Sequence, residues 1–407
     1  MSTPPVEDLL RAAAPRVLGV LVRHHGHFPA CEDAVQEALL AAATHWPRDG
    51  VPDDPTAWLV TVAGRKLTDH WRSENARRRR EDTVAAATPR DAHLAAGPGE
   101  DHPGDTDDTL TLLFLCCHPD LPATAQIALT LRAVGGLTTA QIAAAFLVPE
   151  ATMAQRISRA KQRLRGATFA LSTDPDRLAA VLRVLYLIFN EGHTATSGPD
   201  LSRPDLTAEA IRLTRAVHRR RPDDGEVTGL LALMLLTDAR RATRATADGA
   251  LVPLAEQDRA HWDHDAIAEG VKLVEDTLSR APLGQYQLQS AIAAIHAEAP
   301  STEDTDWAQI LVLYDILARV APNPVVSLNR AVAVAKVHGP RAGLALLDEL
   351  AGDKRLGAHH RLQSVRAHLL ELADDPAAAR TAYRLAARRT LSLPERRYLE
   401  ARADRLR

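Results

Sequence analysis

The sequence has few cysteines and no long uncharged apolar stretch. Its three cysteines, Cys31, Cys116 and Cys117, are too few for a disulfide framework, which favours a reducing cytoplasm. No segment approaches the ~20 apolar residues of a membrane-spanning helix. The N-terminus also lacks the basic and apolar regions of a signal peptide. We therefore expect a soluble cytoplasmic protein with no membrane partner.

Neither sign of charge is in excess, because 49 Lys and Arg residues face 52 Asp and Glu residues, giving a net charge of -3. Only the distribution of charge can therefore indicate a partner. Aromatic residues are also scarce, at 4%, whereas Ala, Leu and Arg dominate and lose little conformational freedom in a helix. At ~150 residues per domain, the 407 residues predict an all-α protein of two or three folding units.

The charges are segregated along the first half of the chain. Eight acidic residues and one basic residue lie between Glu81 and Asp108, together with several Pro and Gly residues. This composition predicts a disordered acidic linker over 81–108. Basic segments at 65–80 and 150–165 flank it. We therefore expect two small helical domains, 1–80 and 109–170, that carry the surfaces for an acidic partner.

The segment from Gly136 to Arg165 has the spacing of a helix-turn-helix unit. Thr138 and Thr139 can cap a first short helix, and Pro149 suits the first position of a second helix. The expected apolar stripe of the second helix consists of Met153, Ile157, Ala160 and Leu164. The outward face then carries Gln155, Arg156, Arg159, Gln162 and Arg163. Side chains of these types suit base edges and phosphates in a DNA major groove.

This segment resembles region 4 of the sigma-70 family of bacterial transcription initiation factors, of the extracytoplasmic-function (ECF) type. The resemblance implies that the second helix reads the upstream (-35) promoter element through Gln155, Arg156, Ser158 and Arg159. Leu147 stands where most members have Gly, and Pro149 where they have a polar residue. A subgroup with a long C-terminal extension shares this form.

The N-terminal part resembles region 2 of the same family. Within Cys31–Trp46, three residues fall on the family pattern that docks on core RNA polymerase: Asp33, Gln36 and Glu37. The next segment, Pro55–Arg72, resembles the helix that binds the melted downstream (-10) element. Its expected inward stripe is Trp58, Leu59, Val62 and Ala63. The residues left accessible to a DNA strand are Arg65, Lys66, Asp69 and Arg72.

Opening DNA also requires a place for an extruded base. The loop Pro47–Thr56 is the expected wall of such a pocket. It contains no aromatic residue, so base stacking would come from Trp46 or Trp71, while Trp58 is expected in the core.

The chain beyond residue 171 resembles the helical extension of that ECF subgroup, in segments such as Leu185–His193 and Gly284–Ala299. We expect a helical extension over 171–320 and TPR-like repeats over 321–407. Ala331 corresponds to Ala367 and Pro340 to Pro376, an offset of 36 residues in both helices of a pair. The resemblance implies control of activity through the extension, whose repeats suit a protein partner.

Some residues of the extension have catalytic potential. Glu191 and His193 follow an apolar run, and acidic residues and a histidine cluster after Trp262, but we favour helix capping and core packing over an active site. Cys116-Cys117-His118 lacks the spacing of a zinc site. We therefore predict no catalytic residues, no cofactor and no metal.

Two functions fit these patterns. The first is a sigma factor, not an enzyme, that directs RNA polymerase core enzyme to promoter DNA. The alternative is a helix-turn-helix regulator with a ligand- or protein-sensing helical domain, which would bind an operator without polymerase. The acidic helix at Glu32–Ala43 and the basic helix at Pro55–Arg72 favour the sigma factor, since a regulator needs neither.

Overall fold

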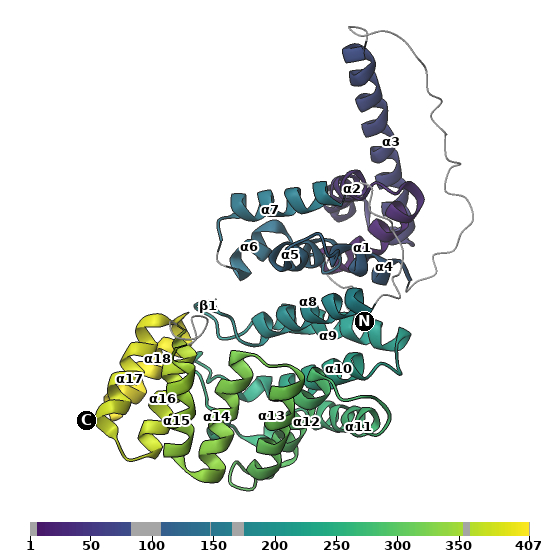
Figure 1. Ribbon diagram of the computed structural model, residues 1–407. Coiled ribbons are helices and arrows are strands. Elements are labelled where there is room, and N and C mark those ends of the chain that lie inside the picture. The colour runs from purple at the N-terminus through teal and green to yellow at the C-terminus, as the bar shows by residue number, and fades with distance from the viewer. Residues whose placement is uncertain (1–5, 83–106, 147, 165–174, 353–358, 407) are drawn as a thin grey trace. The chain divides into compact units, whose positions relative to one another are not determined.

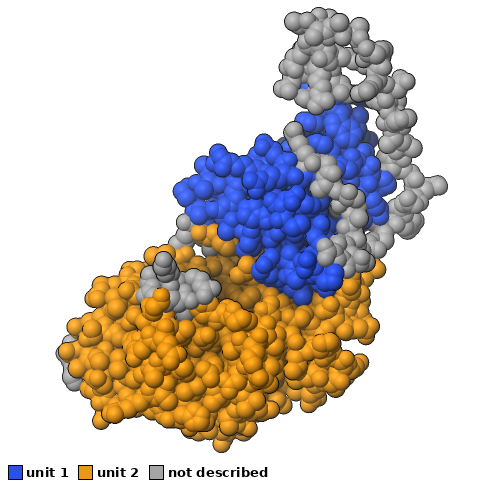
Figure 2. Space-filling model, viewed as in Figure 1, with its two compact units in different colours: residues 1–144, 148–184 blue, residues 145–147, 185–407 orange. Residues whose placement is uncertain are grey.

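A computed structural model describes residues 6–82, 107–146, 148–164, 175–352 and 359–406. The described chain is almost entirely helical, which confirms the all-α prediction (Figure 1). It divides into two compact units, the first made of residues 1–144 and 148–184 and the second of residues 145–147 and 185–407 (Figure 2). We call these unit 1 and unit 2. The boundary at residue 184 falls inside a helix, α8 (Pro175–His193).

Unit 1 contains the helices of both predicted DNA-binding segments. They are α1 (Val6–His25), α2 (Phe28–Asp49), α3 (Pro55–Asp82), α4 (Asp107–Cys116), α5 (Ala123–Ala133), α6 (Thr139–Ala145) and α7 (Glu150–Arg163). Helices α1 to α3 pack on one another, and α5 packs on α4 and α7. The two groups also touch, because α1 packs on α4 and α5, and α2 packs on α7. The predicted domains therefore form one compact unit here.

The contact between α1 and α4 depends on a glycine. A Cβ atom on Gly19 would lie 2.7 Å from the Cβ of Asp108, so only glycine lets α4 approach this closely. Arg23 completes the contact through an ion pair of 3.2 Å with Asp108. The predicted acidic linker is therefore too long at both ends, since α3 continues to Asp82 and α4 begins at Asp107. The rest of it, 83–106, lies outside the described residues.

Unit 2 is an array of antiparallel helices. They are α9 (Pro204–Arg220), α10 (Gly225–Asp238), α11 (His264–Arg280), α12 (Gln285–Glu298), α13 (Trp307–Val320), α14 (Pro324–His338), α15 (Pro340–Leu350), α16 (His360–Leu372), α17 (Pro376–Arg389) and α18 (Leu393–Arg405). Three short 3-10 turns follow α10, namely η1 (Arg241–Thr243), η2 (Leu254–Glu256) and η3 (Arg259–His261). From α9 onward, each helix packs on its neighbours in sequence, and α10 also packs closely on α12, as in a solenoid.

The 36-residue repeat lies in the last helix pairs of unit 2. Pro340 and Pro376 are the first residues of α15 and α17, where a proline costs no helical hydrogen bond. Ala331 and Ala367 are both fully buried in α14 and α16. The small side chains at these equivalent positions let consecutive helices approach closely. The two TPR-like repeats predicted from the sequence are thus present as helix pairs.

A short parallel ribbon joins distant parts of unit 2. Strand β1 (Ser197–Gly198), in the loop after α8, pairs with β2 (Leu391–Ser392), just before α18. The beginning and the end of the helical array are therefore tied together. None of the described helices has the length and apolar character needed to cross a bilayer.

Candidate nucleic-acid and polymerase interface

Helices α6 and α7 form the predicted helix-turn-helix unit. Thr138 caps α6 through a reciprocal pair of hydrogen bonds with Gln141, in which each backbone N–H donates to the other side chain at 2.8 and 3.1 Å. Pro149 is the N-cap of α7 rather than its first residue. Leu147, in the turn, lies outside the described residues. Met153, Ile157, Ala160 and Leu164 are all buried, as the apolar stripe predicted.

The opposite face of α7 presents the residues assigned to the upstream element. Gln155, Ser158 and Arg159 are exposed, and Arg156 is half-buried. Gln162 and Arg163 extend the same polar face toward the helix end. These side chains lie on a firmly packed helix, with donors available to base edges or phosphates.

Helix α2 presents the residues assigned to polymerase docking. The ring nitrogen Nδ1 of His27 caps the helix by accepting from the backbone N–H of Ala30 at 3.3 Å. Asp33 and Glu37 are exposed one turn apart, and Gln36 is half-buried. Leu40 continues this face with 70% of its surface exposed. Leu40 is not among the docking residues predicted from the sequence, although its spacing from Asp33 and Glu37 was a usable signal.

The accessible face of α3 carries the four residues assigned to the melted strand. Arg65, Lys66, Asp69 and Arg72 are all exposed, while Leu59, Ala63 and Leu67 face the core. Lys66 lies 3.4 Å from Glu37 on α2, and Arg72 lies 3.9 Å from Asp69. The predicted DNA surface and the predicted polymerase surface are therefore neighbours.

A hollow of about 360 Å³ lies between the end of α2 and the start of α3. Trp46, Trp58 and the loop residues Gly50 to Pro52 line it. Trp58, which the sequence placed in the core, is half-buried and lies edge-on to the buried Trp46, with ring centroids 5.5 Å apart. Trp71 instead lies edge-on to the ring of His25, with ring centroids 5.1 Å apart. The hollow thus has two indole rings in its wall.

Glu32 links the two halves of unit 1. Its side chain is 1% exposed and accepts from Arg132 Nε of α5 at 3.2 Å. Lys161 Nζ of α7 donates to the same carboxylate and also to Asp33 Oδ1, at 2.9 Å. Burial lowers the pKa of Lys161, but these two carboxylates more than compensate and raise it overall. A residue of the predicted DNA-binding helix is therefore held by the predicted polymerase-docking helix.

The other candidate residues have structural partners. Glu191 is buried and accepts from the backbone N–H and hydroxyl of Thr196, at 3.1 and 3.3 Å. Trp262 packs in an inter-helix core and Asp263 is the N-cap of α11. Burial raises the pKa of the Cys117 thiol to about 12, which keeps it protonated. Among the described residues no group of His, Cys, Asp and Glu is arranged to hold a metal ion.

Comparison with known proteins identifies three segments. Residues 9–77 match Sigma-70 region 2, residues 111–164 match Sigma-70 region 4, and residues 177–278 match a family of unknown function. An uncharacterised protein of Rhizobium meliloti is 42% identical, covering 98% of this chain and 96% of that protein. The probable ECF RNA polymerase sigma factor SigI of Mycobacterium tuberculosis is 28% identical over 47% of this chain and 65% of its own length.

One solved structure, a thermophilic TPR protein of Thermus thermophilus, aligns with 55% of this chain and 96% of its own, with a TM-score of 0.36 and 16% identity.

The two matched regions and the helices that carry them define a transcription initiation factor with a helical extension. The chain carries Sigma-70 regions 2 and 4 and is a distant homologue of ECF RNA polymerase sigma factors. Its role is therefore that of a DNA-binding sigma factor in transcription initiation, and its family points to a regulator rather than an enzyme.

Proposed function

We propose that three helices of unit 1 divide the work of initiation. Helix α2 docks on core polymerase through Asp33, Gln36, Glu37 and Leu40. Helix α7 reads the -35 element through Gln155, Arg156, Ser158 and Arg159. Helix α3 holds the melted -10 strand through Arg65, Lys66, Asp69 and Arg72. The observation that carries the proposal is that most of these polar side chains are exposed, with Gln36 and Arg156 half-buried, on helices whose opposite faces are buried.

The hollow beside α3 supports the assignment to DNA melting. Two tryptophans line it, next to a helix face that carries Arg65 and Lys66. An extruded base stacks on aromatic rings while cations hold its backbone, and such stacking is worth about 1 to 3 kcal/mol per base. We propose that Trp58 is the stacking partner, since it is accessible whereas only 3% of Trp46 is exposed.

Run-off transcription with purified core polymerase tests this proposal. A sigma factor initiates only when core enzyme is present. The alternative, a regulator, would bind an operator alone and as a dimer with paired half-sites. Tight operator binding without core, together with no initiation in its presence, would contradict the proposal.

Leu40 provides a test of polymerase docking. An exposed leucine costs nothing to replace in the free protein, but an apolar contact at the centre of an interface is worth more than ~1.4 kcal/mol. We expect Leu40→Asp to keep the stability of the free protein within about 0.5 kcal/mol, and to weaken core binding at least ~tenfold. Surface plasmon resonance with immobilised core enzyme measures the affinity.

The matched control is Val312→Asp on α13, because Val312 is also an exposed apolar residue on a helix, at 57%. Equal core affinity of the Leu40→Asp and Val312→Asp variants would show that this face of α2 does not dock on polymerase.

We also propose that the extension modulates initiation in the same chain. Unit 2 is more than half of the protein and packs as a unit of its own. A chain ending at Val184 keeps the described contacts within unit 1, including the hydrogen bond from Arg177 to the carbonyl of Phe114 at 2.7 Å. We expect it to initiate less well than the intact protein in run-off transcription. Equal initiation, with circular dichroism showing a folded chain, would mean that the extension is not needed.

A further inference from the structure

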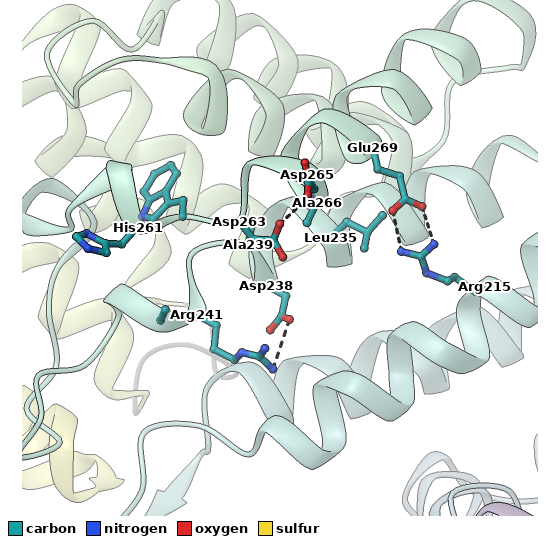
Figure 3. Close-up of a pocket in the computed structure, with 12 residues that line it drawn as sticks. Arg215, Leu235, Asp238, Ala239, Arg241, His261, Asp263, Asp265, Ala266 and Glu269 are labelled. Carbon is teal, nitrogen blue, oxygen red and sulfur yellow. Dashed lines mark hydrogen bonds and ion pairs between the residues drawn. The ribbon is translucent and has the colours of Figure 1, made fainter. Parts of the chain in front are cut away.

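The segment that follows α10 contains several arginines, of which some pair with carboxylates and others do not. A pocket of about 550 Å³ is lined by residues of α9, α10, α11 and this segment (Figure 3). There, Arg215 and Glu269 point toward each other and form two hydrogen bonds of 2.7 and 2.8 Å. Arg241 and Asp238 form an ion pair of 3.7 Å. The arginines that line this pocket therefore each have an acidic partner.

Arg240, next to Arg241, is not part of that pocket. Its guanidinium group forms no hydrogen bond or ion pair with any described residue, and its charged neighbours are two other arginines, Arg259 and Arg244. Burial and the Arg259 charge lower the pKa of Arg240 to about 10. The group still carries a full positive charge at pH 7, so Arg240 is a partly buried cation without an ion-pair partner among the described residues.

Arg259 and Arg244 hold two more guanidinium groups in this region. Arg259 lies over the ring of Trp262 at 4.5 Å and donates from Nη1 to the carbonyls of His296 and Ala299, at 2.7 and 2.8 Å. Its Nη2 is buried and has no partner among the described atoms. Arg244 donates to the carbonyl of His193 and, at 2.8 Å, to Thr194 Oγ1. Neutral acceptors thus fix both groups in place, and the carboxylates that act on them, Glu303 on Arg259 and Asp238 and Glu395 on Arg244, lie beyond ion-pair distance.

The nearby histidines do not change this balance. Burial, together with Arg240 and Arg259, lowers the pKa of His296 to about 4. Burial and neighbouring arginines also lower the pKa of His193, whose Nδ1 is buried without a partner in the described structure. Both rings are therefore neutral at pH 7. They leave the region positive and offer further hydrogen-bonding nitrogens.

The carboxylates in the surroundings are used elsewhere. Asp238 pairs with Arg241, and Glu395 lies 3.0 Å from His360 and accepts from Thr390 at 2.8 Å. Glu303 acts on Arg259 from a greater distance. None of the three guanidinium groups, Arg240, Arg244 or Arg259, is within ion-pair distance of a described carboxylate.

We propose that Arg240, Arg244 and Arg259 form a binding site for an oxyanion, the phosphate or carboxylate group of a small-molecule ligand. Guanidinium groups donate two parallel hydrogen bonds to such groups, and Arg259 Nη2 is an unused donor of this kind. A bound anion would offset the like charges of Arg240 and Arg259. The cluster assembles residues from the segment after α10, the end of α8 and the end of α12. The site does not depend on the roles proposed for unit 1.

Thermal unfolding of the intact protein tests the proposal. A ligand that binds only the folded state raises the melting temperature. We expect 10 mM inorganic phosphate or citrate, compared with chloride at equal ionic strength, to raise the transition of unit 2 by several degrees. Phosphate and citrate are tested separately, because the anion that gives the larger shift in melting temperature shows whether the site prefers a phosphate or a carboxylate group. Isothermal titration calorimetry with the same anions measures the affinity directly.

The decisive variant is Arg240→Gln, which removes the charge and keeps most of the volume. It should lose the response to both anions, and it should melt no lower than the wild type in chloride because an unpaired, partly buried cation has gone. Arg219→Gln, at an exposed arginine of α9, is the matched control and should keep the full response. This comparison removes the general stabilisation that phosphate and citrate give to any protein.

The proposal fails if neither anion shifts the wild-type transition more than chloride does, or if Arg240→Gln responds like Arg219→Gln. Should Arg240→Gln not fold, Arg240→Lys keeps the charge without the planar fork. That variant is expected to bind the anions at least tenfold more weakly than wild type in the titration, and unchanged affinity would overturn the proposal.

Discussion

Replacing Arg156 and Arg159 together with alanine is expected to abolish core-dependent run-off transcription. Both residues lie on the outward face of α7, away from the buried stripe of Met153, Ile157 and Ala160. A well-placed arginine contact to a base is worth about 1 to 3 kcal/mol. Two such losses correspond to a fall of at least ~30-fold in promoter occupancy. Because the buried face of α7 is untouched, the variant should fold normally.

The assay should use a promoter from upstream of the protein's own gene, with purified core enzyme and defined salt, since phosphate contacts weaken steeply as salt rises. Arg219→Ala combined with Arg280→Ala is the matched control, because both residues are exposed arginines of unit 2. Core binding should remain normal in both variants. Normal initiation by the Arg156→Ala/Arg159→Ala variant would show that α7 does not read the promoter.

Sequence patterns predicted the features that depend only on residues near one another in the chain. The stripe of Met153, Ile157 and Ala160 follows from helical periodicity alone, and all three residues are buried. The offset between Pro340 and Pro376 was likewise visible, because each proline begins a helix. Neither inference required knowledge of any contact between distant segments.

Pairings between distant residues were not predictable in this way. Lys161 counted as part of a basic patch, yet its ammonium group lies against Glu32 and Asp33. The fact that Glu32 is buried depends on α5 and α7, which follow about a hundred residues later. Trp58 lies on the apolar stripe of α3, but it lines a hollow together with Trp46 and the loop at Gly50. Hydrophobic periodicity predicts which face of a helix is apolar, but it does not predict which other elements pack on that face.

The contact at Glu32 also bears on how the free protein changes on a promoter. The -35 and -10 elements are named for positions ~25 base pairs apart, which is about 85 Å along the duplex at 3.4 Å per base pair. Helices α7 and α3 belong to one unit of ~180 residues, whose radius of gyration is expected to be only about 16 Å. We infer that reading both elements at once requires α7 to leave α2.

Glu32→Ala is expected to destabilise unit 1 strongly. The change leaves Arg132 and Lys161 facing each other without their shared carboxylate, and their side chains are only 18% and 16% exposed. Removing one partner of a buried ion pair costs about 3 to 5 kcal/mol, which for a unit of this size lowers the melting temperature by roughly 6 to 20 °C. Scanning calorimetry of the intact protein would follow this transition.

Glu37→Ala on the same helix is the matched control, because Glu37 pairs with Lys66 at 3.4 Å with 60% of its side chain exposed. Such an exposed pair contributes at most about 1 kcal/mol, so this variant should melt close to the wild type. The two residues differ in burial and not in type, helix or charge. If both variants melted at the same temperature, the buried carboxylate of Glu32 would not be what holds α7 and α5 against α2. The separation of α7 from α3 on a promoter would then not require the Glu32 ion pairs to break.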